Sequence, residues 1–197
     1  MVYTREELAA LYATCQKYGL RLFIDGARLG YGLVSAACDY DLPFLAKHCD
    51  VFYIGGTKVG AMMGEAVVFS GMKTPKYFFT NVKRHGALLA KGRMLGIQFD
   101  TLFTDELYFK ISRHAIATAT RIRSIFEKHG ITIAYDSPTN QQFVVLSPAL
   151  YEALSQKVAF EIWERKSEHE IICRFVTSWA TKEEELDELD RILQAYA

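Results

Sequence analysis

The sequence has few cysteines, no excess of charge of either sign and no long apolar run. Its four cysteines form no C-x-x-C pair and have no metal-ligand spacing to the five histidines, so we predict reduced, buried thiols and no metal site. The 23 basic residues balance the 23 acidic ones, which argues against binding of nucleic acid or of an anionic membrane. No apolar stretch is long enough to span a bilayer, and the first residues do not resemble a secretory signal. These absences predict a cytoplasmic protein with small-molecule or protein partners.

Half of the residues are hydrophobic, which is enough for a substantial core. The chain opens with the pattern of a helix followed by a strand. The stretch YTREELAALYATCQKYGL has Thr4 and, three residues later, Glu7, a capping box that predicts a helix ending at Gly19. Residues 20–24 are apolar apart from Arg21, and they predict a buried strand that ends at Asp25. Functional residues of such parallel sheets gather at the carboxyl ends of the strands.

Two further strands are predicted next, with a reversal of direction between them. A short helix near Pro43 precedes the apolar stretch VFYIGG, and GEAVVFS follows only a few residues later. The link from Lys58 to Gly64 is too short for a crossover helix, so we expect an antiparallel return. The sequence therefore predicts an α/β fold with a mixed, mostly parallel sheet.

The second half of the chain has the pattern of a smaller α+β unit. Residues 75–103 predict one or two helices, and a long helical pattern then ends at Gly130. Short strands are predicted in ITIAY, QQFVVLS, VAFEIWE and EIICRFVTSW, and a last helix from the capping box of Thr181 and Glu184. The predicted domains are 1–104 and 105–197.

Lys58 is the first candidate for chemistry, because it directly follows a buried strand. Desolvation there would lower its pKa and free its lone pair, as a Schiff-base lysine requires. The flanking Gly55, Gly56 and Gly60 would let a flat ligand approach the backbone. A phosphate-binding P-loop is excluded, because Thr57 precedes the lysine and a valine follows it. A surface-exposed lysine is the alternative interpretation.

Asp25 is the second candidate, at the end of the first strand. A carboxylate in this position can keep a pyridine nitrogen protonated, which turns pyridoxal phosphate into an electron sink. Arg28 would lie nearby as a partner for a ring oxygen or as the ion-pair partner of Asp25. An ordinary Asp-Gly turn with a structural ion pair is the alternative.

Together these motifs resemble the threonine aldolase and β-eliminating lyase family, which has the aspartate aminotransferase-like fold of pyridoxal-phosphate enzymes. The resemblance rests on FIDGARLGYGL followed by DVFYIGGTKVGAMMGEAVVF. It continues through RHGALLAKGRMLGIQF, PTNQQFVVL and RFVTSWAT, and so extends over essentially the whole chain. The implied fold is the C-terminal part of the large, cofactor-binding domain followed by a small α+β domain.

The resemblance also implies roles for individual residues. Lys58 is implied to be the Schiff-base lysine, Asp25 the partner of the pyridine nitrogen, and Arg28 and Thr57 contacts of pyridoxal phosphate. Arg174, in ICRFVTSW, is implied to bind the α-carboxylate of the substrate. Its guanidinium matches a carboxylate in two hydrogen bonds, whereas an edge-strand arginine that faces solvent is the alternative.

The resemblance implies a lyase that converts a β-hydroxy amino acid to glycine and an aldehyde by retro-aldol cleavage. β-Elimination or another reaction on the same scaffold is the alternative. Members of the family carry a long segment before the helix that opens this chain, so we expect a C-terminal portion of a larger enzyme. Its expected partner is either another copy, in a dimer or tetramer, or the missing N-terminal half. A non-catalytic fragment is the remaining alternative.

Overall fold

The computed structural model describes residues 2–196, which divide into two compact units. The first unit is Val2–Ile111 and the second begins at Ser112, within a long helix, α6 (Leu107–Lys128). The boundary predicted from the sequence, between residues 104 and 105, stays a prediction.

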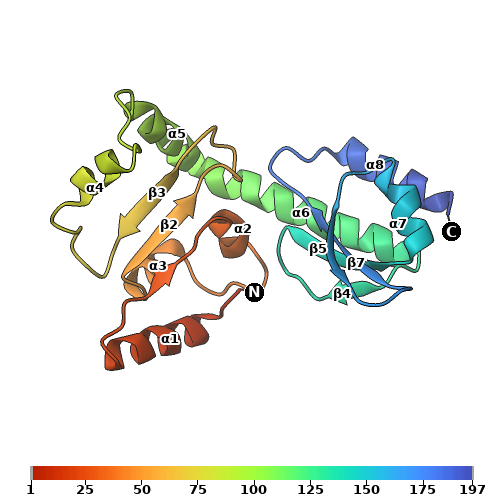
Figure 1. Ribbon diagram of the computed structural model, residues 1–197, viewed down its shortest axis with the longest axis horizontal. Coiled ribbons are helices and arrows are strands. Elements are labelled where there is room, and N and C mark those ends of the chain that lie inside the picture. The colour runs from red at the N-terminus through yellow and green to blue at the C-terminus, as the bar shows by residue number, and fades with distance from the viewer. Residues whose placement is uncertain (1, 197) are drawn as a thin grey trace. The chain divides into compact units, whose positions relative to one another are not determined.

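The first unit is built on a three-stranded mixed sheet (Figure 1). The strands are β1 (Phe23–Ile24), β2 (Val51–Gly55) and β3 (Glu65–Phe69), in the order β1-β2-β3. β1 and β2 are parallel, whereas β2 and β3 are antiparallel, which confirms the predicted reversal. The parallel pair brings the carboxyl ends of β1 and β2 to the same edge of the sheet.

The helices predicted near the N-terminus, near Pro43 and within residues 75–103 are present, whereas the short helices α2 and η1 were not predicted. The capping box of the first helix is confirmed, because Thr4 N donates to Glu7 Oε2 at 2.8 Å and Glu7 N donates to Thr4 Oγ1 at 3.2 Å. The segment 75–103 contains two helices, as one of the predicted possibilities requires. The elements are α1 (Arg5–Lys17), α2 (Leu29–Leu33), α3 (Leu42–Lys47), α4 (Phe78–Arg84), α5 (Arg93–Phe103) and η1 (Thr104–Glu106).

The first strand is shorter and more exposed than predicted. Only Phe23 and Ile24 pair with β2, and the side chains of Leu20 and Phe23 are 59% and 58% exposed. β1 lies at the edge of the sheet, and the described residues leave these two side chains exposed to solvent. The prediction of a buried strand over residues 20–24 is therefore wrong for the part of the chain described.

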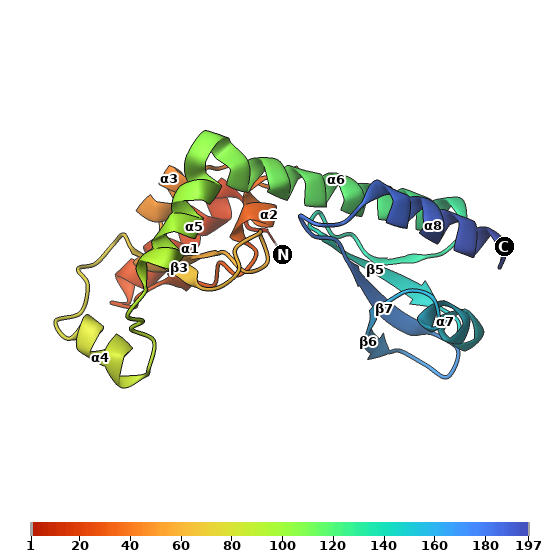
Figure 2. The same ribbon diagram turned by 90° about the horizontal axis from the view of Figure 1, so that it is seen from above.

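The second unit is an antiparallel sheet with helices packed on one face. Its strands have the order β4-β5-β7-β6, and α6 and α8 lie side by side along the sheet (Figure 2). The core between them contains Phe126, Val144, Leu146 and Cys173, each completely buried. The other elements are β4 (Ile133–Tyr135), β5 (Gln141–Leu146), α7 (Pro148–Ser155), β6 (Glu161–Arg165), β7 (Ile171–Val176) and α8 (Glu183–Gln194).

The helices of the second unit differ from the prediction in two ways. α7 was not predicted, although Ser147 caps it by accepting from Leu150 N at 3.3 Å. The last helix begins one residue later than expected, since Lys182 N donates to Glu185 Oε2 at 3.1 Å. The hydroxyl of Thr181 instead accepts from Ser178 N in the preceding turn.

The structure also tests the predicted state of the cysteines and the predicted lack of a membrane-spanning segment. All four cysteines are free, but Cys15 and Cys38 are only partly buried, so the prediction of burial holds for Cys49 and Cys173 alone. None of the helices in residues 2–196 is both long and apolar enough to cross a membrane.

Tyr108 gives a test of how the first unit is held together. Its buried hydroxyl donates to Gly55 O and accepts from Gly30 N, both at 3.0 Å. We expect Tyr108→Phe to lower the free energy of unfolding by about 1–3 kcal/mol, because buried polar backbone groups lose their partner.

Urea denaturation measures this change, with Tyr18→Phe as the control at an exposed tyrosine. Equal stability of the two variants would contradict the structural role of the Tyr108 hydroxyl.

Candidate functional site

The turns that follow β1 and β2 lie against each other at one edge of the first sheet. Gly55 N donates to Gly26 O at 2.9 Å. A Cβ on Gly26 would lie 1.6 Å from Tyr53 O, and a Cβ on Gly55 would lie 2.4 Å from Ala27 O. The two backbones therefore touch only because both positions are glycine, and this contact brings the motifs of Asp25 and Lys58 together.

Protein atoms fill the positions that a Cβ would occupy at these glycines. A Cβ on Gly56 would lie 2.8 Å from both Gly64 O and a ring atom of Phe99. The approach of a flat ligand to the backbone at Gly55 and Gly56 stays a prediction. Both glycines allow close packing of the chain on itself, and Gly60 adopts a left-handed φ of 92° in the following loop.

Asp25 is an exposed carboxylate with two hydrogen-bond donors. Its Oδ1 accepts from the hydroxyl of Tyr53 and from Ala27 N, the latter at 3.0 Å. The bond from Tyr53 is the largest cause that lowers the pKa of Asp25, and the charges of Lys58 and Arg28 lower that pKa further. The same bond raises the pKa of Tyr53 to about 12. Asp25 is therefore held ionised at neutral pH.

Lys58 has a fixed backbone and an exposed side chain. Tyr31, whose side chain is buried, donates its hydroxyl proton to Lys58 O, and the neighbouring Val59 is completely buried. The prediction that Lys58 is desolvated is wrong for the described residues, because the strand end opens to solvent. Its charge acts on Asp25 across the contact between the turns.

Arg28 and Thr57 lie beside these two residues. Arg28 is partly buried, its Nε is buried without a hydrogen-bond partner, and it makes no ion pair with Asp25 among residues 2–196. The Thr57 hydroxyl donates to Glu65 Oε1 at 3.0 Å. The structure thus brings Asp25, Arg28, Thr57 and Lys58 to one edge of the sheet.

Three residues at this edge escaped the sequence analysis. Tyr53 and Glu65 come from β2 and β3, and Tyr31 comes from α2. Tyr53 could have been found only by aligning the two parallel strands, since the register that pairs Ile24 with Phe52 places Tyr53 opposite Asp25. Glu65 and Tyr31 depend on contacts between distant segments, which carry no local pattern.

Arg174 belongs to the second unit, where it lies on an inner strand. Its Nη1 donates to Gln141 Oε1 at 2.9 Å and its Nη2 pairs with Glu161. The guanidinium carbon lies 5.3 Å from the centre of the Trp163 ring, and the side chain is only 18% exposed. The alternative of an edge-strand arginine that faces solvent is therefore wrong. Its Nε is buried and has no partner among the described residues.

Sequence comparisons match the chain to a known family and to curated relatives. A sequence model of the family described as β-eliminating lyase matches residues 1–149. The low-specificity L-threonine aldolase of Pseudomonas sp. (strain NCIMB 10558) is 30% identical over 195 residues, which are 98% of this chain and 56% of that protein. The enzyme of the same name from Pseudomonas aeruginosa is 29% identical over 96% of this chain and 54% of its own length. The chain spans about half the length of these curated relatives.

Solved structures agree with the sequence comparison. The Leishmania major threonine aldolase superposes with a TM-score of 0.94 at 36% identity, over 98% of this chain and 57% of that one. A serine palmitoyltransferase from Sphingomonas wittichii has a TM-score of 0.66 at 14% identity, over 95% of this chain and 50% of that chain, and shows a common fold alone. The expected fold is thereby confirmed.

Tyr53→Phe tests the electrostatics of this edge. The substitution removes the hydroxyl that donates to Asp25, so we expect the pKa of Asp25 to rise toward its ordinary value. A lowered folded pKa gives stability that is present above the unfolded pKa and is lost as the pH falls through the folded pKa. The variant should therefore have less of this stability at neutral pH, and the loss should be complete at a higher pH than in the parent.

Carboxyl carbon NMR over a pH titration measures the change at Asp25. Tyr135→Phe is the matched control, because it removes a hydroxyl that donates to Glu164 in the second unit. An unchanged titration of Asp25 in Tyr53→Phe would contradict the assignment.

Proposed function

Because this chain belongs to the β-eliminating lyase family, we propose that it forms part of a pyridoxal-phosphate-dependent lyase that cleaves a β-hydroxy amino acid to glycine and an aldehyde. The observation that carries the proposal is the contact between the two turns, which brings the Asp25 carboxylate within electrostatic reach of Lys58. The names of the threonine aldolase relatives support this choice of reaction. We further propose a cytoplasmic homo-oligomer.

The residues of the first unit fit pyridoxal phosphate. When bound, this cofactor withdraws electrons from the α-carbon of an amino acid. Asp25 is suited to hold a proton on the ring nitrogen, because Tyr53 and Ala27 keep its carboxylate ionised. The unpartnered Nε of Arg28 is a donor for an oxygen of the ring. Thr57 remains a proposed contact of the cofactor. Its hydroxyl proton is donated to Glu65, so only its oxygen is left to accept a hydrogen bond.

Lys58 is the proposed covalent anchor of the cofactor. Its amine is exposed, whereas its backbone is fixed by Tyr31 and by the buried Val59. A fixed backbone with a free amine positions the reacting nitrogen without binding it elsewhere. Once the substrate amine had taken its place, Lys58 would be free to hold a proton beside the α-carbon.

Arg174 is the proposed binding residue for the substrate α-carboxylate. Its guanidinium plane is held by Gln141 and by the ring of Trp163, so little side-chain entropy remains to be lost on binding. Glu161 now occupies one nitrogen as a carboxylate partner. A substrate carboxylate would have the same chemistry at this position and would compete with Glu161.

β-Elimination is the second candidate reaction, and the description of the matching family favours it. It uses the same Asp25 and Lys58, but a leaving group departs from the β-carbon and the carbon chain stays intact. The products separate the two reactions. L-Threonine gives glycine and acetaldehyde in the first case and a keto acid with ammonia in the second. A chain that releases neither and takes no label at Lys58 would be a non-catalytic fragment.

Labelling at Lys58 is the direct test of the proposed function. The purified chain is incubated with pyridoxal phosphate, reduced with borohydride and mapped by peptide mass spectrometry. We expect pyridoxyl label on Lys58 well above that on other lysines, because the exposed amine lies beside Asp25 and Arg28.

Lys58→Ala should abolish the selective label, whereas Lys73→Ala, at an exposed lysine outside the two turns, should leave it unchanged. Label spread evenly over the lysines would overturn the proposal.

Arg174→Lys tests the carboxylate site. A lysine is a point charge that cannot give two parallel hydrogen bonds, so we expect KM for L-threonine to rise at least about tenfold with a smaller change in kcat. Arg165→Lys, on the neighbouring strand β6, is the control.

Binding can be followed without turnover in a Trp179→Phe background, where Trp163 is the only tryptophan of the chain. Glycine should change its fluorescence in the parent and not in Arg174→Lys. Equal responses would remove Arg174 from the proposed site.

A further inference from the structure

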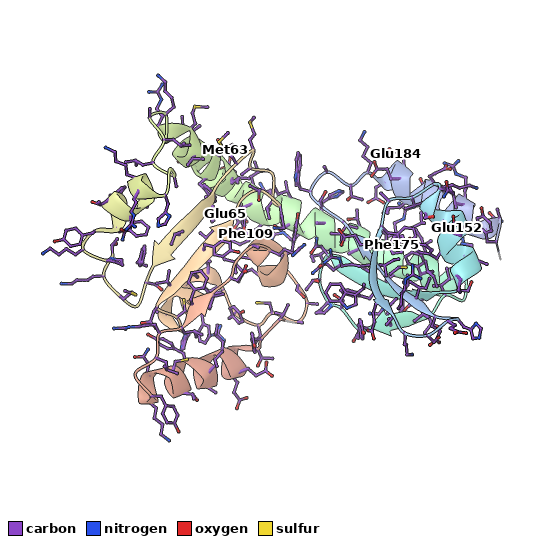
Figure 3. The ribbon with its side chains drawn as sticks, viewed as in Figure 1. Met63, Glu65, Phe109, Glu152, Phe175 and Glu184 are labelled. Atoms are coloured by element: carbon purple, nitrogen blue, oxygen red, sulfur yellow. The ribbon has the colours of Figure 1, made fainter. Side chains whose placement is uncertain are left out.

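Glu65 is an exposed carboxylate whose two oxygens both bind the turn that carries Lys58. Oε2 accepts from Gly56 N, and Oε1 accepts from Thr57 Oγ1 at 3.0 Å. These donors are the two residues that immediately precede Lys58. Figure 3 shows Glu65 at the start of β3, and the register pairs it with Gly55 at the end of β2. The carboxylate therefore clamps the Lys58 turn from the opposite strand.

The loop between these strands explains why such a clamp is needed. Nine residues, 56–64, connect β2 to β3, too many for a tight two-residue hairpin that would fix its own geometry. Gly60 and Gly64 both adopt positive φ. The far part of the loop is held separately, since Gln98 Oε1 accepts from Met62 N at 2.7 Å. Only the near part carries Lys58. Glu65 holds its first two residues, Gly56 and Thr57, and Tyr31 holds the carbonyl of Lys58.

Glu65 also lies close to the residue that supports Asp25. Tyr53 pairs with Val67 and Gly55 pairs with Glu65, so Tyr53 and Glu65 are diagonal neighbours on one face of the sheet. The charge of Glu65 contributes to the raised pKa of Tyr53. One carboxylate thus contacts the Lys58 turn and borders the Tyr53–Asp25 pair.

We propose that Glu65 is a positioning residue that fixes the Lys58 turn, through hydrogen bonds to Gly56 and Thr57, relative to Asp25. The proposal rests on the proposed function only for its effect on chemistry at Lys58. The hydrogen bonds themselves can be tested in the chain without any cofactor.

Amide hydrogen exchange at Gly56, followed by NMR, is the first arm of the experiment. Glu65→Ala removes both acceptors, so we expect exchange of the Gly56 amide to accelerate at least about tenfold. Glu65→Gln keeps the shape, an acceptor for Gly56 and a donor to the Thr57 oxygen, and should restore protection to within a few fold of the parent. Glu65→Asp, which is too short to reach both donors, replaces the alanine variant if that variant does not fold.

Glu6→Ala is the matched control, because Glu6 is an exposed glutamate of α1 that is remote in sequence from the turn. Exchange at Gly56 in Glu65→Ala within about twofold of this control would overturn the proposal.

Labelling is the second arm. With pyridoxal phosphate and borohydride, the ratio of label at Lys58 to label at the exposed Lys73 should fall severalfold in Glu65→Ala and recover in Glu65→Gln. A loss of global stability alone would not change this ratio in the folded chain, so an unchanged ratio with selective parental labelling would overturn the positioning role. If the parent itself shows no selective label, the proposed function fails, and the exchange arm still decides whether Glu65 holds the turn.

Discussion

A backbone hydrogen bond from Gly55 to Gly26 holds together the two segments that carry the candidate chemistry. Such a contact requires two chains of backbone to approach without side chains between them, and both positions are glycine. Asp25 and Arg28 come from one segment, Thr57 and Lys58 from the other. Their proximity is thus a property of the main chain, and the surrounding side chains refine it.

The charged side chains at this edge of the sheet lie on the surface and not in the core. Asp25 and Lys58 are both exposed, so neither bears the large cost of burying an unpaired ion. Hydrogen bonds do the tuning instead, because Tyr53 lowers the pKa of Asp25 more than any charge does. In the second unit Arg174 follows a different principle, since it is mostly buried and its guanidinium is paired, hydrogen-bonded and placed against an aromatic ring.

The sequence predicts those features that depend on local patterns. The capping box of Thr4, the reversal after Lys58 and the placement of Asp25 at a strand end all follow from residues close together in the chain. The exposure of Phe23 and Lys58 could not be predicted, because burial depends on what covers a strand and not on the strand itself. Glu65, Tyr31 and the partners of Arg174 were also out of reach, since each contact joins separate elements.

The two strands that end at the site differ in how firmly they are paired. β1 pairs with β2 over two residues, whereas β2 pairs with β3 over five. Local opening of a protein takes the least free energy where the fewest hydrogen bonds and buried contacts must break. The segment that carries Asp25 should therefore detach in brief fluctuations while the hairpin around Lys58 stays closed. Any covering of the exposed β1 edge would suppress these fluctuations, and so would couple assembly at that edge to the integrity of the site.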